Sequence, residues 1–263
     1  MKSKVLFLCV ALICAGIFFT KCKKVNENPE SYINVKVEFG EKYDFDNVKA
    51  VMYSYDDDLI IGESGYSKGK FSIKLPKTVE SIYLEEFDFN YEADWITINP
   101  ENALMNFIFL EAYKSDEWED DFIYATLSFN QTQTKVTLTF ALGMYLYVDK
   151  NVTIKGSETE KEIIEGIEIN VNMKADVYLK KGWNIIYEEY SIIMQMNGGS
   201  IKSSITTKKP KDMKWYVEDD LEELFDNLIP YSTEQQPSQL KTMVKSSDIK
   251  ALISKYRVLK NFN

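Results

Sequence analysis

The chain has 263 residues, of which 45% are hydrophobic and 27% are charged, so it can bury a sizeable core in one or two domains. Forty-one Asp and Glu residues against 31 Lys and Arg give a formal net charge of −10, which argues against a nucleic-acid partner because phosphate binding needs a basic surface. The absence of His excludes Ser-His-Asp and Cys-His catalysis and His-ligated metal sites. No Gly-rich phosphate loop or dinucleotide fingerprint occurs either, and we expect neither a cofactor nor a metal.

Residues 1–21 are typical of a secretory signal peptide. Lys2 and Lys4 precede an apolar run over Val5–Phe19, which is shorter than the roughly twenty apolar residues that a membrane-spanning helix needs. Cys22 follows this run, and a Cys at this place resembles the lipobox of bacterial lipoproteins, in which that Cys is lipidated and becomes the first residue. The resemblance implies a lipid bilayer as partner and an outer-membrane anchor, with the protein facing the periplasm or the cell surface. Ordinary signal cleavage beside an incidental Cys is the alternative.

The remaining chain is expected to be all-β, with two antiparallel β-sandwich or partly open barrel domains and short C-terminal helices. Short alternating apolar segments separated by turn residues indicate strands, and no stretch with a helical period interrupts this series. The expected organisation is a lipidated tether over 22–30, a small β-sandwich over 31–92, a second antiparallel β domain over 93–217 and a helical, partly basic tail over 218–263.

In the first domain, apolar residues alternate with polar ones, which is typical of half-buried strands. The expected strands are Ile33–Phe39, Val48–Tyr55, Leu59–Gly62, Phe71–Pro76 and Ser81–Leu84. The run Gly69-Lys70-Phe71-Ser72-Ile73-Lys74-Leu75-Pro76 resembles a hairpin of small transthyretin-like or carboxypeptidase-regulatory-like sandwiches in secreted Bacteroidetes proteins. This resemblance covers residues 31–88 and implies a β-sandwich.

The second domain carries longer alternations, after a junction near Asp88–Asp94 and an acidic, aromatic stretch without a simple period. The expected strands are Ile123–Phe129, Lys135–Phe140, Met144–Ile154, Ile163–Leu179, Trp183–Met196, Ile201–Thr206 and Met213–Val217. Lys180-Lys181-Gly182 joins two of them, Ile163–Leu179 and Trp183–Met196. We expect these two to form a hairpin, because Gly182 adopts a positive φ easily.

Three phrases in this half of the chain look like the uncharacterised lipoproteins that are abundant in Bacteroidetes. They are Tyr147-Val148-Asp149-Lys150-Asn151-Val152-Thr153-Ile154-Lys155-Gly156, Leu179-Lys180-Lys181-Gly182-Trp183-Asn184-Ile185-Ile186-Tyr187 and Met213-Lys214-Trp215-Tyr216. Together with Cys22 and the N-terminal sandwich, the likeness extends to Val217. It implies an envelope address and a β fold, and it supplies no catalytic residues.

The end of the chain changes to helical patterning. Glu218–Leu228 places Leu221 and Phe225 on one apolar stripe, and the acidic residues of its first turn suit the positive start of a helix. Asp248–Leu259 predicts a second helix. From residue 231 onward, six basic and two acidic residues give a charge of +4. We expect this tail either to remain a peripheral, partly solvated helix or to dock on the acidic body.

The candidate binding residues are three tryptophans, Trp95, Trp118 and Trp183. They lie near predicted loops or turns and could stack on sugar rings, and their alternative role is core packing. Two acidic runs, Asp56–Asp58 and Glu117–Asp121, offer oxygen ligands for Ca²⁺. Consecutive carboxylates point in different directions and lack calcium-loop spacing, so solvated turns are the favoured interpretation.

Four functional classes stay open. The favoured one is a membrane-anchored envelope lipoprotein that acts as a non-enzymatic binding or structural protein, with an envelope protein or a glycan as its partner. A surface glycan-binding accessory protein is the alternative, supported by the aromatic content. A fimbrillin-like adhesin subunit comes third, because fimbrillins are cut after an Arg near the first domain, whereas Arg257 is the only Arg of this chain. A carboxylate-dependent hydrolase, which needs only two acids at a fixed separation, comes last.

Overall fold

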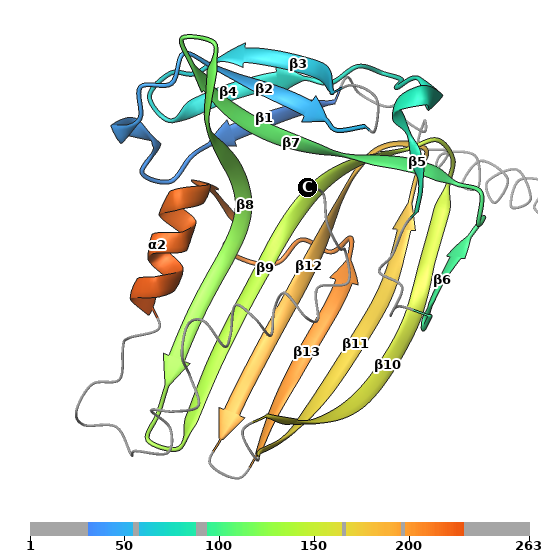
Figure 1. The fold of residues 1–263 in the computed structure, drawn as a ribbon, viewed down its shortest axis with the longest axis vertical. Coiled ribbons are helices and arrows are strands. Elements are labelled where there is room, and N and C mark those ends of the chain that lie inside the picture. The colour runs from blue at the N-terminus through green and yellow to red at the C-terminus, as the bar shows by residue number, and fades with distance from the viewer. Residues whose placement is uncertain (1–30, 55–57, 88–93, 165–166, 196–197, 229–263) are drawn as a thin grey trace, which may run out of the picture.

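The computed structural model describes residues 31–54, 58–87, 94–164, 167–195 and 198–228 (Figure 1). Strands make up 67% of this described part, which contains one α-helix, so the expected mainly β fold is confirmed. The expected signal peptide and tether lie outside the described residues.

The elements follow each other in this order. The first strands are β1 (Tyr32–Lys36), β2 (Asn47–Met52), β3 (Leu59–Gly65), β4 (Lys70–Lys74), β5 (Glu85–Glu86), β6 (Ile96–Asn99) and β7 (Leu104–Lys114). The long strands are β8 (Glu117–Gln131), β9 (Lys135–Val148), β10 (Val152–Ile164), β11 (Ile167–Leu179), β12 (Gly182–Gln195) and β13 (Gly198–Thr206). β14 (Lys214–Val217) leads into α2 (Glu218–Leu228), and two 3₁₀-helices, η1 (Gly40–Lys42) and η2 (Ser81–Tyr83), lie in the first part.

Most strands belong to one large mixed sheet. Its order is β3-β2-β7-β8-β9-β12-β13-β11-β10-β6, with β14 paired to β8 and β5 paired to β7. In Figure 1 the strands β8 to β13 form a tall curved wall, and β1 to β4 lie with β7 across its upper end. β1 and β4 make a separate two-stranded sheet. The described residues form no closed barrel.

The large sheet is mixed, whereas purely antiparallel sheets are expected, because β11 and β13 run parallel. The expected hairpin of Ile163–Leu179 with Trp183–Met196 is wrong, because these two strands are not neighbours in the sheet. β13 lies between β11 and β12, and β12 pairs with β9 and β13 instead. Alternation shows which face of a strand is buried, but it does not choose the neighbouring strand.

Two further strand predictions are corrected. Ser81–Tyr83 forms a 3₁₀-helix, in which the Leu84 N–H donates to the Ser81 carbonyl at 3.2 Å, where a strand over Ser81–Leu84 is expected. The expected strand Met144–Ile154 is interrupted at Asp149–Asn151, where the chain turns between β9 and β10. β7 lies in the acidic, aromatic stretch for which the sequence shows no simple period.

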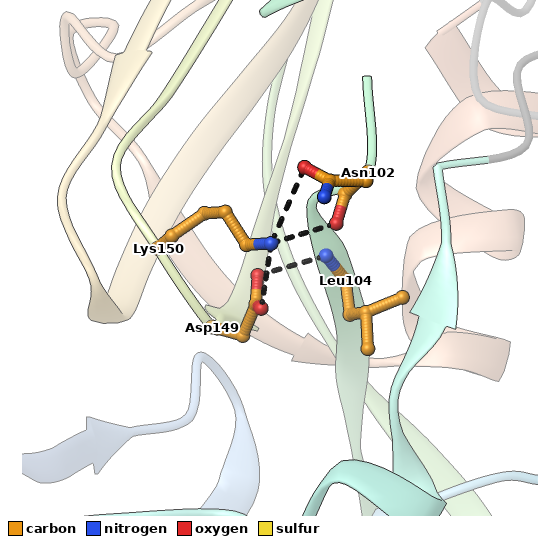
Figure 2. A network of polar contacts seen from close by, with 4 residues as sticks. All are labelled: Asn102, Leu104, Asp149 and Lys150. Carbon is orange, nitrogen blue, oxygen red and sulfur yellow. Dashed lines mark hydrogen bonds and ion pairs between the residues drawn. The ribbon is translucent and has the colours of Figure 1, made fainter. Parts of the chain in front are cut away.

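The turn between β9 and β10 is held against the start of β7 (Figure 2). Asp149 accepts a hydrogen bond from the Leu104 N–H at 2.8 Å, and its own N–H donates to the Leu104 carbonyl at 3.0 Å. Lys150 Nζ donates to the Asn102 carbonyl at 2.8 Å and lies 3.2 Å from the Asp149 carboxylate. These polar contacts end β9 at a point where the alternating pattern alone would continue it.

β1 and β4 pack against β2 and β7 at the upper end of the molecule. Ile33 of β1, Ile73 of β4, Val48 of β2 and Leu110 of β7 are all buried in one hydrophobic cluster. β2 also pairs directly with β7, so strands from before and after the expected junction share a sheet. The junction near Asp88–Asp94 itself falls almost wholly outside the described residues.

The wall of long strands follows the expected alternation. On β11 the buried residues are separated by exposed or half-buried ones, and they are Ile169, Val171, Met173, Ala175, Val177 and Leu179. Val171 and Met173 pack in a cluster with residues of β9, β12 and β13, whereas Val177 and Leu179 pack in a second cluster with residues of β7, β9 and β10. One face of β11 therefore supplies two successive hydrophobic clusters.

α2 confirms the helix expected over Glu218–Leu228. Leu221 and Phe225 are buried, and the Phe225 ring lies edge-on to Phe140 of β9 with 6.0 Å between the ring centroids. The amphipathic stripe thus faces the large sheet, as its spacing predicts. The second expected helix, Asp248–Leu259, lies outside the described residues.

Gly156→Ala should weaken the attachment of β6 to the large sheet. Gly156 of β10 pairs with Ile96 of β6, and a Cβ at this position would lie 2.0 Å from the Trp95 carbonyl oxygen. Since the obstacle is backbone, we expect the free energy of unfolding to fall by about 1–3 kcal/mol, measured by urea denaturation.

Gly65→Ala is the matched control. Its Cβ would meet no atom closer than 4.0 Å, so it should change the free energy of unfolding by less than about 0.5 kcal/mol. Equal losses for the two variants would show that contact with Trp95 is not the cause.

Candidate functional site

The three tryptophans singled out from the sequence occupy different environments. Trp95 is half-buried before β6 and packs against two hydrophobic clusters. Trp183 of β12 is also half-buried; its indole N–H donates to the Pro76 carbonyl at 2.6 Å, and its ring lies edge-on to Tyr147 at 5.0 Å. Trp118 of β8 is 56% exposed. Of the three, Trp118 therefore offers its ring to a ligand, while the other two serve mainly in packing.

Trp118 lies at the upper end of β8, where this strand pairs with β7. It stands opposite Tyr113 in the strand register. Its indole N–H donates to Asp121 Oδ1 at 3.2 Å. This bond holds one edge of the ring while the side chain remains largely exposed.

Glu111 of β7 stands opposite Asp121 in the register and is only 3% exposed. The hydroxyl groups of Tyr53 and Tyr113 donate to its two carboxylate oxygens, and the Tyr113 bond is 2.5 Å long. A buried carboxylate needs such donors, because burial removes its water. Burial and the bond to Glu111 raise the pKa of Tyr113 to about 12, and they raise the pKa of Tyr53 as well. Both tyrosines therefore remain protonated donors at neutral pH.

Two further contacts extend this surface. Lys49 Nζ lies 3.7 Å from the centroid of the Tyr113 ring, and the Tyr53 ring lies 5.1 Å from that of Phe109. We call the whole set the Trp118 face; it consists of Lys49, Tyr53, Phe109, Glu111, Tyr113, Trp118 and Asp121. It combines aromatic rings with two carboxylates and one ammonium group on neighbouring strands.

A second group of acids lies where β8 meets the start of α2. Val217 of β14 pairs with Phe122 of β8, which brings Glu218 beside Asp120 and Asp121. Burial raises the pKa of Asp120 to about 6. Burial also raises the pKa values of Asp121 and Glu218, and repulsion from nearby carboxylates adds to each shift. Deprotonation of this group therefore costs stability.

The acidic runs do not form a metal centre in the described part of the chain. No group of three or more Cys, Asp or Glu side chains there could hold a metal ion. Glu117–Asp121, expected to be a solvated turn, forms the start of β8, and the turn lies before it at Ser115 and Asp116. Asp56 and Asp57 of the other run lie outside the described residues.

Sequence reasoning found Trp118 but missed its neighbours on β7 and β2. Glu111 and Tyr113 lie on a strand that the pattern does not predict, and Tyr53 follows β2 directly. The available signal is the spacing of two between Phe109, Glu111 and Tyr113, which places these side chains on one face of a strand.

No protein-family model matches this chain, and neither the curated proteins nor the solved structures contain a match.

Asp120→Asn should stabilise the protein at neutral pH. The unfolded chain loses the Asp120 proton near 3.8, whereas the raised folded-state pKa keeps the proton up to about 6, so stability falls as pH rises through this window. With solvent screening allowed for, we expect a gain on the order of 1 kcal/mol at about pH 7.5 and none at about pH 3.5, measured by urea denaturation.

Glu119→Gln is the control for this charge effect. Glu119 precedes Asp120 on the same strand but is exposed, so its substitution should change the free energy of unfolding at about pH 7.5 by less than about 0.5 kcal/mol. If Asp120→Asn is less stable than the unsubstituted protein at neutral pH, the charge of buried Asp120 does not destabilise the fold as inferred.

Proposed function

We propose that this chain is a membrane-anchored lipoprotein of the cell envelope that acts as a non-enzymatic binding protein, with the Trp118 face as its ligand-contacting surface. The observation that carries the proposal is the 56% exposure of Trp118 beside a hydrogen-bonded set of tyrosine and carboxylate side chains. An aromatic side chain that is already held in place can cover a ligand at little entropic cost. The surface is therefore preorganised for contact.

The anchoring part of the proposal is supported by the sequence. The apolar run that ends shortly before Cys22 is typical of export, and acyl chains on that Cys would hold the protein on a membrane. Cys22 lies outside the described residues. Within the described ranges there is no helix long and apolar enough to cross a bilayer.

Binding is favoured over hydrolysis by the way the acids of the Trp118 face are used. A carboxylate-dependent hydrolase needs one acid to donate a proton and a second to act as nucleophile or base. Glu111 is buried and accepts hydrogen bonds from two tyrosines, and Asp121 accepts one from Trp118. These bonds give both carboxylates a positioning role within the surface.

Glycan binding is the second candidate function. It is favoured because Trp118 and Asp121 lie next to each other. The apolar face of a sugar ring can stack on an indole while its hydroxyl groups bond to a carboxylate at the ring's edge. The bond between Trp118 and Asp121 places these two groups side by side. A surface glycan-binding accessory protein is the function that this pairing supports.

Trp118→Ala should weaken retention on plant or mucin polysaccharides by at least about tenfold, which corresponds to about 1.4 kcal/mol. The measurement is affinity electrophoresis of the processed protein against a panel of these polymers. Tyr178→Ala is the matched control, because Tyr178 is an aromatic residue of similar exposure, 53%, on the distant strand β11. Absence of retention by the unsubstituted protein, or equal losses in the two variants, would remove the glycan candidate.

Cys22→Ser should abolish lipid attachment and release the protein from membranes. Without the thiol, no thioether to diacylglycerol can form, and the tether has no other acyl-acceptor Cys. We expect loss of radiolabelled palmitate incorporation and recovery of the variant in the soluble envelope fraction. Undiminished labelling would contradict the assignment of Cys22, independently of what the Trp118 face binds.

A further inference from the structure

Three strands, β7, β8 and β9, pair with one another in a triangle. Each of them uses one edge to pair with both of the others, at different residues. β7 pairs with β8 near one of its ends and with β9 near the other, and β8 and β9 pair with each other farther along. Leu110 of β7, Phe122 and Ile123 of β8, and Met144 of β9 take part in none of these three pairings. On their other sides they pair with β2, β14 and β12. The three strands therefore frame an opening, at the place where they diverge in Figure 1.

A cavity of about 190 Å³ lies at this opening, and we call it the junction cavity. Aromatic and aliphatic side chains dominate its lining, among them Ile33, Phe122 and Trp215. Asp121 and Leu142–Tyr145 also line it and keep partial solvent exposure. An apolar cavity of about 150 Å³ holds benzene, whereas pockets for drug-sized ligands begin at about 300 Å³. The size therefore fits one small ring.

The wall of the junction cavity is formed by stacked aromatic rings. The Trp215 ring stacks on Tyr124 at 4.8 Å and on Tyr145 at 6.2 Å, with interplanar angles of 20° and 17°. Gly143 makes this arrangement possible, because a Cβ there would lie 2.5 Å from Tyr124 Cδ1. Flat rings held in this way give the cavity a rigid aromatic wall, which favours contact with a flat ligand.

Among the described residues that line the junction cavity, Asp121 alone has a charged side chain. One of its oxygens accepts the bond from Trp118, and a carboxylate has capacity for several further donors. The other side chains of the lining are apolar apart from the hydroxyl groups of Tyr124 and Tyr145 and the indole N–H of Trp215, and backbone groups supply the remaining polar surface. A ligand with one apolar ring and one donor group therefore matches these side chains better than a sugar with hydroxyl groups all round.

We propose that the junction cavity binds a small neutral molecule of the phenol class, which extends through the opening between the strands, with its aromatic ring toward Trp215 and its hydroxyl group donating to Asp121 on the other face of β8. The ligand of the junction cavity differs from that of the Trp118 face, although Asp121 contributes to both sites. The ring supplies apolar contact and the hydroxyl group supplies orientation, as is usual for small-molecule sites. The proposal does not depend on glycan binding at Trp118.

The experiment compares three probes that differ in one property each. These are 4-methylphenol, toluene, which lacks the donor, and 4-methylcyclohexanol, which lacks the aromatic ring. Binding to the full chain is measured by calorimetry, and the methyl group of ¹³C-labelled Met144, assigned with Met144→Leu, reports whether the probe enters the junction cavity. We expect 4-methylphenol to bind at least about tenfold more tightly than either analogue and to shift the Met144 signal, because a hydrogen bond to a charged group is worth that factor or more.

Two variants test the assigned contacts. Asp121→Asn should reduce the affinity for 4-methylphenol about tenfold and leave toluene binding unchanged, because it removes the charged acceptor alone. Ile123→Phe should fill the cavity and abolish binding of all probes, with circular dichroism confirming that the variant is folded. Tyr178→Ala, on a distant strand, should change nothing.

The proposal is overturned if the unsubstituted protein binds no probe up to about 10 mM, a range that already includes very weak affinities. It is also overturned if 4-methylphenol and toluene bind equally, or if binding occurs without a change of the Met144 signal. If Ile123→Phe does not fold, the Asp121→Asn comparison and the Met144 signal still decide the question, and failure of all probes would leave the Trp118 proposal standing.

Discussion

The division of strand edges among β7, β8 and β9 is the constraint on which the rest of the structure depends. One edge of a strand can bind only one neighbour at a given residue, so a strand that changes partners leaves a short unpaired interval between them. Here three strands change partners at the same place. Because of this exchange, β7 pairs both with β2 at the upper end of the molecule and with β9 of the wall. The junction cavity lies where the three strands separate. Asp121, the last β8 residue paired with β7, consequently lies at the cavity and on the Trp118 face.

The sequence predicts strands well where one face is buried and the other is wet. β11 alternates without exception from Ile169 to Leu179, and its strand character is plain from the pattern. β7 is different because it is covered on both faces, and it also buries the polar side chains Asn106 and Glu111. Asn106 bonds to the carbonyl groups of Tyr53 and Tyr83, contacts that no local pattern contains. Fold class and the α2 helix were therefore accessible from sequence, while strand order was not.

The candidate site shows the same limit. The sequence suggests Trp118 and Trp183 equally, because both lie near predicted loops or turns. The difference between them arises from a distant segment, since the Pro76 carbonyl accepts the Trp183 indole bond and no such cover lies over Trp118, which is 56% exposed in the described structure. In the sequence, Glu111 is likewise one of 41 acidic residues. Only the structure shows that Tyr53 and Tyr113 donate hydrogen bonds to it. Exposure and hydrogen-bond partners are properties of the fold, and they decide which aromatic residue can contact a ligand.

The parallel pairing of β11 with β13 has a consequence for the order in which the wall is completed. Because synthesis and export both proceed from the N-terminus, β11 and β12 are available before β13, and their alternating patterns suit each other. They must nevertheless stay apart, because the native sheet inserts the later strand between them. The antiparallel pairs β10–β11 and β9–β12 can form early, but they remain two separate pieces with open edges until residues 198–206 arrive. β13 is thus the closing strand of the wall, and a chain truncated before it would present two unpaired edges prone to association.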